Sequence, residues 1–190
     1  MLKTMRTILH ALSYGTIEVE SSRRLVDLKK LDAMRIFLKK LDVKVYNGDY
    51  EVPVRLYFPT EEAMQRKLQE PLDLPVLLFF HGGGWVTESV DTYNRVCARM
   101  AQSTGQIVMS VEYRLAPEYR FPTAFDDCYA AAKELYTTDH LLKTTPEHIT
   151  VIGDSAVNTS RSGSPFIQRF MEISSPPLSF ISMVKVTFTS

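Results

Sequence analysis

Hydrophobic positions along the chain follow two spacings, which predict two kinds of segment. In residues 22–41, apolar side chains recur every three or four residues, as on one face of an amphipathic helix. Residues 43–46 and 52–58 instead show strand-like runs, and the Asn47-Gly48 dipeptide between them suits a tight hairpin. The sequence therefore predicts a helix followed by an antiparallel hairpin. The helical stripe consists of Leu25, Leu28, Leu31, Met34, Leu38 and Leu41.

Strands and helices are expected to alternate after a polar surface connection at residues 60–74. Apolar runs predict strands at 75–80, 107–113 and 149–153, and helical spacing predicts helices at 92–104 and 123–136. Gly105 is placed to end the first helix, and Thr123 with Asp126 forms a capping-box pattern at the start of the second. This alternation is typical of a parallel sheet covered on both faces. Residues 158–165 are turn formers, and 178–188 is a strand candidate.

Composition and charge narrow the function classes. The 190 residues include 22 basic and 22 acidic side chains, a balance that argues against a nucleic-acid partner. No apolar run reaches the length of a membrane-spanning helix, so stable membrane insertion is not expected. Two cysteines cannot form a disulfide framework, and the start of the chain is too polar for a signal peptide, so we expect a cytoplasmic protein.

The amino-terminal segment departs from this balance. Residues 1–41 hold nine Lys or Arg and four Asp or Glu. Two interpretations remain open: the solvated basic face of a packed helix, which we favour, or a helix lying on a membrane surface.

Two motifs carry candidate chemistry, and each follows a predicted strand. His81-Gly82-Gly83-Gly84-Trp85 comes directly after strand 75–80, and its glycines let backbone N–H groups approach a ligand closely. Gly153-Asp154-Ser155-Ala156-Val157 comes at the end of the third strand. A serine on a sharp turn after a strand is the context of a nucleophile elbow, in which the next N–H, here that of Ala156, faces the developing oxyanion.

With both motifs in this order, residues 42–156 resemble the hormone-sensitive-lipase-like branch of the α/β-hydrolases, which includes acetyl esterases and small carboxylesterases. The resemblance also rests on Asp91-Thr92-Tyr93, on the run from Tyr113 to Glu118 and on Phe121-Pro122. It implies an α/β fold, the N-terminal half of an α/β-hydrolase, with a mostly parallel sheet flanked by helices and an N-terminal helical cap segment.

The resemblance also implies a function and a site. The substrate would be a small-molecule ester, with neither cofactor nor metal. The nucleophile would be Ser155, the oxyanion donors Gly82, Gly83 and Ala156, and the supporting residues His81, Gly84, Trp85 and Asp154. Trp85 would either line the acyl pocket or close the core over the glycine loop.

The chain departs from the family after Ala156. The family continues Gly-Gly-Asn, whereas this chain continues Val157-Asn158-Thr159. The family order is Ser, then an acid, then His, but no His or Asp follows Ser155, and Glu172 is the only acid there. A serine without its base is a poor nucleophile. We therefore expect a serine hydrolase of short-chain esters, truncated after the elbow and inactive in this form.

The alternative is a non-catalytic fragment or pseudoenzyme from a frame-shifted or truncated gene. The expected organisation is a helical cap segment at 1–41, a partial hydrolase core at 42–157 and an aberrant or disordered tail at 158–190. Among the remaining residues, Tyr113 and Arg114 are expected to anchor a strand-to-loop transition and Asp126 to cap a helix, while Asp127 is a candidate partner for a base. The sequence leaves homo-oligomerisation open.

Overall fold

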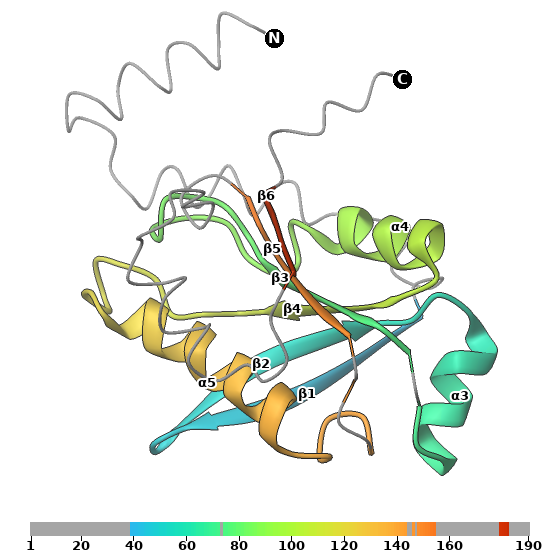
Figure 1. Ribbon diagram of the computed structural model, residues 1–190. Helices are drawn as coiled ribbons and strands as arrows, with labels where there is room; N and C mark the ends of the chain where they lie inside the picture. The colour runs from blue at the N-terminus through green and yellow to red at the C-terminus, as the bar shows by residue number, and fades with distance from the viewer. Residues whose placement is uncertain (1–38, 73, 144–145, 147, 155–178, 183–190) are drawn as a thin grey trace, which may run out of the picture.

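The computed structural model describes residues 39–72, 74–143, 146, 148–154 and 179–182, and these ranges contain six strands and three helices (Figure 1). No helix in these ranges is long and apolar enough to cross a membrane. In chain order the elements are β1 (Lys40–Asn47), β2 (Tyr50–Tyr57), α3 (Glu61–Gln69), β3 (Val76–Phe80), α4 (Asn94–Thr104), β4 (Ile107–Val111), α5 (Thr123–Thr137), β5 (Ile149–Gly153) and β6 (Ser179–Ser182).

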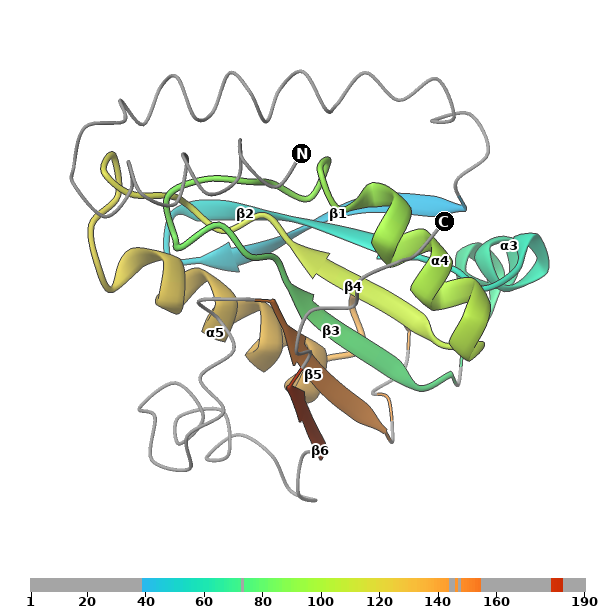
Figure 2. The same ribbon diagram turned by 90° about the horizontal axis from the view of Figure 1, so that it is seen from above.

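The strands form one sheet in the order β1-β2-β4-β3-β5-β6. Strands β1 and β2 form an antiparallel hairpin, and β2 pairs with β4 antiparallel, whereas β4, β3, β5 and β6 are mutually parallel. The sheet is therefore mostly parallel with an antiparallel hairpin at one edge, and Figure 2 shows β5 and β6 at the opposite edge. The strand expected near 178–188 is present as β6, and it pairs with β5.

Helices cover both faces of the sheet, as the fully apolar strands predicted. All five residues of β3 are buried, and they alternate between two cores. Val76, Leu78 and Phe80 belong to the core that includes α5, whereas Leu77 and Phe79 belong to the core that includes α4. Figure 1 shows these two helices on opposite sides of the sheet. This two-sided burial leaves the strand ends as the places where polar side chains gather.

The hairpin is confirmed, with two differences in its bounds. Asn47 pairs with Tyr50, so the turn consists of Gly48 and Asp49, and Gly48 has a φ of +61°. Glycine at the first central position is what a type II′ turn requires. The first strand begins at Lys40, so the last two residues of the expected helix 22–41 belong to the sheet, where they pair with β2. Residues 1–38 of the expected cap segment lie outside the described residues.

One helix was missed and one cap was wrong. Residues 61–69 form α3 within the stretch expected as a surface connection, and its N-cap Thr60 accepts a hydrogen bond from the Ala63 N–H at 3.1 Å. In α5, Thr123 is already the first helical residue and Pro122 is the N-cap, with no side-chain cap hydrogen bond. The capping box, and with it the cap role of Asp126, is therefore incorrect. Gly105 ends α4 with a φ of +69°, as expected.

Candidate active site

The two motifs meet because β3 and β5 are adjacent parallel strands. Phe80 at the end of β3 lies opposite Gly153 at the end of β5. The carboxyl ends of parallel neighbours share one edge of the sheet, so the glycine loop and Asp154 emerge side by side. The Asp154 N–H donates to the Phe80 carbonyl at 3.2 Å. Ser155 and Ala156 lie outside the described residues.

The glycine loop is a tight turn held by the carbonyl of Gly83. This carbonyl accepts hydrogen bonds from the N–H groups of Val86 at 3.1 Å and Thr87 at 3.0 Å, and from the Thr87 hydroxyl at 3.2 Å. Gly83 has a φ of +107°, and a Cβ there would meet the Thr87 carbonyl oxygen at 2.2 Å. Only glycine fits this position. Trp85 has a φ of +64°, which is uncommon for a large side chain.

His81 supports this loop from inside the protein. Its side chain is buried, and its ring stacks on Tyr113 with centroids 4.1 Å apart. Nδ1 donates to the Gly82 carbonyl at 2.8 Å, and the Tyr113 hydroxyl donates to the His81 carbonyl at 2.6 Å. Burial lowers the pKa of His81 to about 4. The imidazole is therefore neutral near pH 7 and fixes the loop, which fits the structural role expected for His81.

Tyr93 and Asp154 form a second support, beside Gly82. The Tyr93 hydroxyl donates to Asp154 Oδ2 at 2.6 Å. Gly82 lies so close to this pair that a Cβ on it would be 3.1 Å from Asp154 Oδ2 and 3.1 Å from the Tyr93 hydroxyl. Burial, and then the hydrogen bond to Asp154, raise the pKa of Tyr93 above its ordinary value. The phenol therefore stays protonated and keeps donating across the neutral pH range.

Asp127 pairs with a base, and that base is Arg114. The carboxylate is completely buried. It accepts hydrogen bonds from the Arg114 backbone N–H at 3.1 Å, from Arg114 Nε at 2.9 Å and Nη2 at 2.7 Å, and from Asn47 Nδ2 at 2.7 Å. Tyr50 lies under the guanidinium, with 3.9 Å from its ring centroid to Cζ. The ion pair ties the end of β4 to α5 and to the hairpin, so Arg114 anchors the strand-to-loop transition as predicted.

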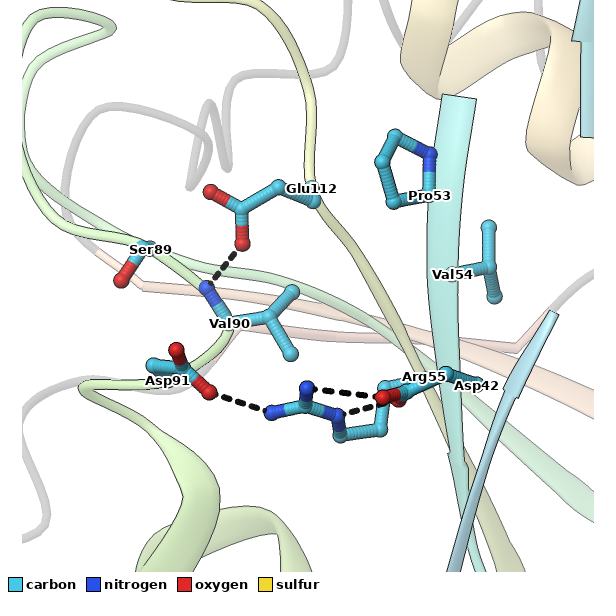
Figure 3. A pocket seen from close by; sticks show the side chains of 8 residues that line it. All are labelled: Asp42, Pro53, Val54, Arg55, Ser89, Val90, Asp91 and Glu112. Atoms are coloured by element: carbon cyan, nitrogen blue, oxygen red, sulfur yellow. Dashed lines mark hydrogen bonds and ion pairs between the residues drawn. The ribbon is translucent and has the colours of Figure 1, made fainter. Parts of the chain in front are cut away.

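A hollow of about 300 Å³ lies beside the segment that joins the glycine loop to α4 (Figure 3). Its Arg55 is engaged by Asp42, with Nε–Oδ1 at 2.5 Å, and by Asp91, with Nη1–Oδ1 at 2.6 Å. Glu112 accepts from the Val90 N–H at 2.6 Å. These bonds hold the segment in place. The guanidinium is committed to two carboxylates, so we do not assign this hollow a catalytic role.

The expected supporting residues His81, Gly84, Trp85 and Asp154 follow the adjacent ends of β3 and β5, and their role in a reaction stays a prediction. Trp85 packs against Tyr113, with ring centroids 5.1 Å apart, and against the core that includes α5. The contact between Tyr93 and Asp154 was missed. Tyr93 stands in the quoted Asp91-Thr92-Tyr93 motif, but 61 residues separate it from Asp154, and a linear pattern does not reveal such a pairing.

The chain is similar in sequence to known hydrolases. A family model described as the alpha/beta hydrolase fold matches residues 77–156. Carboxylesterase NlhH of Mycobacterium tuberculosis is 36% identical over 135 residues, which are 71% of this chain and 39% of that protein. An arylesterase of Saccharolobus solfataricus is 38% identical over 90 residues, 47% of this chain and 26% of that protein.

The chain is also similar to solved structures of esterases. A thermostable carboxylesterase cloned from a metagenomic library matches with a TM-score of 0.61 and 34% identity, covering 74% of this chain and 46% of its own. An esterase of Pyrobaculum calidifontis matches with a TM-score of 0.60 and 32% identity, covering 80% of this chain and 48% of its own. The chain thus spans less than half the length of the proteins it matches here.

Proposed function

The chain belongs to the hormone-sensitive-lipase-like branch of the α/β-hydrolases, and from this premise we propose that its site serves the hydrolysis of short-chain carboxylic esters by a serine nucleophile. One observation carries the proposal. The parallel register of β3 and β5 brings the glycine loop and Asp154, the residue before Ser155, to the same edge of the sheet. Nucleophile and oxyanion donors must meet in this way for acyl transfer.

In the proposed reaction, Ser155 Oγ attacks the ester carbonyl. The carbonyl oxygen becomes an oxyanion, and the N–H groups of Gly82, Gly83 and Ala156 stabilise it by hydrogen bonding. A base takes the serine proton, and the alcohol leaves with a proton. His81 is unsuited to be this base, because its ring is buried beneath the loop and its pKa is lowered to about 4.

We further propose that this chain by itself is a very slow esterase. No His or Asp follows Ser155 in its sequence, and an unassisted serine hydroxyl reacts poorly. An oxyanion site that lacks its base retains a rate enhancement of roughly 10³–10⁴ over water.

The test is the turnover of 4-nitrophenyl acetate by the purified chain and by Ser155→Ala. We expect slow hydrolysis above the buffer blank, little changed by the substitution. Turnover of many per second, lost in Ser155→Ala, would contradict the proposed slow rate. His10, His140 and His148 would then be the candidate bases to test. A rate equal to the blank in both proteins would contradict the oxyanion site.

The alternative proposal is a non-catalytic remnant of an esterase, favoured by Val157-Asn158-Thr159 where the family has Gly-Gly-Asn. Translation of the coding DNA beyond codon 156 in the other two frames tests it. A frame that reads Gly-Gly-Asn and continues to Asp and His motifs would identify the altered tail as a frame-shift product.

A further inference from the structure

Tyr93 occupies an unusual position between the two halves of the proposed site. Its hydroxyl donates to Asp154, the residue before Ser155, at 2.6 Å. A Cβ on Gly82, one of the proposed oxyanion donors, would lie 3.1 Å from the same hydroxyl. One phenol oxygen is therefore in contact with the elbow and very close to the glycine loop.

We infer that Tyr93 is a positioning residue that holds Asp154, the residue before the proposed nucleophile Ser155, against the glycine loop at Gly82. This inference rests on the proposed function. The glycine loop and the elbow leave the sheet from different strands, so their separation beyond the strand ends depends on what bridges them. Tyr93 contributes such a bridge, because its hydroxyl donates to Asp154 and lies directly beside Gly82. A displacement of about 1 Å at a reacting centre typically costs about 10²-fold in rate.

Tyr93 is itself rigidly held, as a positioning residue must be. Residues on both sides of it bond to Arg55: Asp91 accepts from Nη1 at 2.6 Å, and the Asn94 side-chain oxygen accepts from Nη1 at 2.9 Å. The Asn94 oxygen also accepts from the buried Tyr57 hydroxyl at 2.7 Å. The Arg55–Asp91 pair, which is drawn in Figure 3, and the two hydrogen bonds to Asn94 thus fix the backbone that carries Tyr93.

The ring of Tyr93 is fixed as well. It packs against Phe79 of β3 with centroids 5.3 Å apart, and it lies 6.1 Å from the His81 ring. Removing only the hydroxyl leaves these ring contacts in place. Tyr93→Phe therefore separates the bridging role from the packing role.

The experiment supplies the missing base from solution. The chain is incubated with 4-nitrophenyl acetate and imidazole, and acetylation of Ser155 is followed by peptide mass spectrometry. Ser155 Oγ bonds to the acetyl carbon, 4-nitrophenolate leaves, and imidazole takes the serine proton. We expect Tyr93→Phe and Asp154→Ala each to slow this acetylation by about 10- to 100-fold. The double variant should be no slower than the slower single variant.

Tyr46→Phe is the matched control, because the exposed Tyr46 hydroxyl also donates to a carboxylate, that of Glu51, at the far hairpin. It should acetylate as fast as the wild type. The dependence on imidazole concentration should keep its shape in Tyr93→Phe, because the proton acceptor is unchanged, while the limiting rate falls. A purely structural role would lower the melting temperature and leave the rate per folded molecule unchanged.

Wild-type acetylation of Ser155 in Tyr93→Phe would overturn the inference and leave the proposed function standing. If the wild type shows no acetylation of Ser155 above the background measured in Ser155→Ala, both the inference and the proposed function are overturned. If Tyr93→Phe fails to fold, Asp154→Ala carries the same test, because it removes the acceptor of the Tyr93 hydroxyl and leaves Tyr93 in place. A rate in Asp154→Ala equal to the wild type would then overturn the inference.

Discussion

Two carboxylates near the same edge of the sheet differ in their burial and in their hydrogen bonding. Asp127 is completely buried, and four hydrogen bonds from Arg114 and Asn47 engage its two oxygens. Asp154 is only partly buried, and its Oδ2 accepts a hydrogen bond from Tyr93. Both belong to networks that join separate strands, but only that of Asp154 adjoins the proposed nucleophile.

This difference distinguishes a hydrogen-bond network that stabilises the fold from one that positions the residues of a site. Asp127 balances a cation and has its oxygens engaged, so its network adds rigidity and offers little to a ligand. His81, beside Asp154, has a buried Nε2 without a hydrogen-bond partner in the described part of the chain. We therefore expect substitution of Asp127 to lower the free energy of unfolding. Substitution of Tyr93 or Asp154 should mainly lower the rate of the proposed reaction.

The largest stability effect is expected for Asp127→Ala. Removing one partner of a buried pair leaves the other charge uncompensated, which costs about 3–5 kcal/mol of unfolding free energy. Urea unfolding followed by the fluorescence of Trp85, the single tryptophan, measures this change. Asp126→Ala is the control: this partly exposed neighbour in the first turn of α5 should cost less than about 1 kcal/mol. Equal losses in the two variants would contradict the comparison.

The second effect is a pH dependence of stability that comes from His81, the buried residue beside Asp154. Burial lowers the pKa of His81 from 6.5 to about 4, so between these values the unfolded chain binds a proton that the native chain does not. The free energy of unfolding is therefore unaffected by this group above pH 6.5. It falls by about 3 kcal/mol as the pH decreases from 6.5 towards 4.

Urea unfolding at several pH values between 4 and 7.5 measures this slope. His81→Gln should flatten this slope relative to the wild type. A slope that survives His81→Gln would assign the pH dependence to other groups.

The smallest effect compares neighbouring glycines of the loop. Gly84→Ala meets only the cost of a left-handed backbone, about 1–2 kcal/mol, because no described atom lies within 4 Å of the new Cβ. Gly83→Ala adds a contact of 2.2 Å with the Thr87 carbonyl, so the loop must move. We expect Gly83→Ala to be the less stable variant by a further 1 kcal/mol or so, and to lose the residual ester hydrolysis as well. Unfolding curves and 4-nitrophenyl acetate turnover measure the two effects, and identical behaviour of both variants would contradict the tight turn.

The sequence by itself determined the alternation of strands and helices after residue 75, the hairpin and the place of the glycine loop. Each has a local signal in the sequence, such as the continuous apolar run of β3 and the Gly105 that ends α4 in a left-handed conformation. It also predicts the residues of the proposed site, because a glycine loop and a serine that each follow a strand form a local pattern. The helix α3 carried a readable signal in its Thr60 cap, which its polar composition obscured.

The tertiary structure alone decided which residues meet. Asp127 finds Asn47 across 80 residues, and Tyr93 finds Asp154 across 61. These pairings depend on the order β2-β4-β3-β5 in the sheet, which brings the strand ends together and which no single segment encodes. Whether a carboxylate has all its oxygens engaged is likewise a property of the assembled sheet. The physical reason is that hydrogen bonding and desolvation act through space, between groups that the chain brings together only when the sheet has formed.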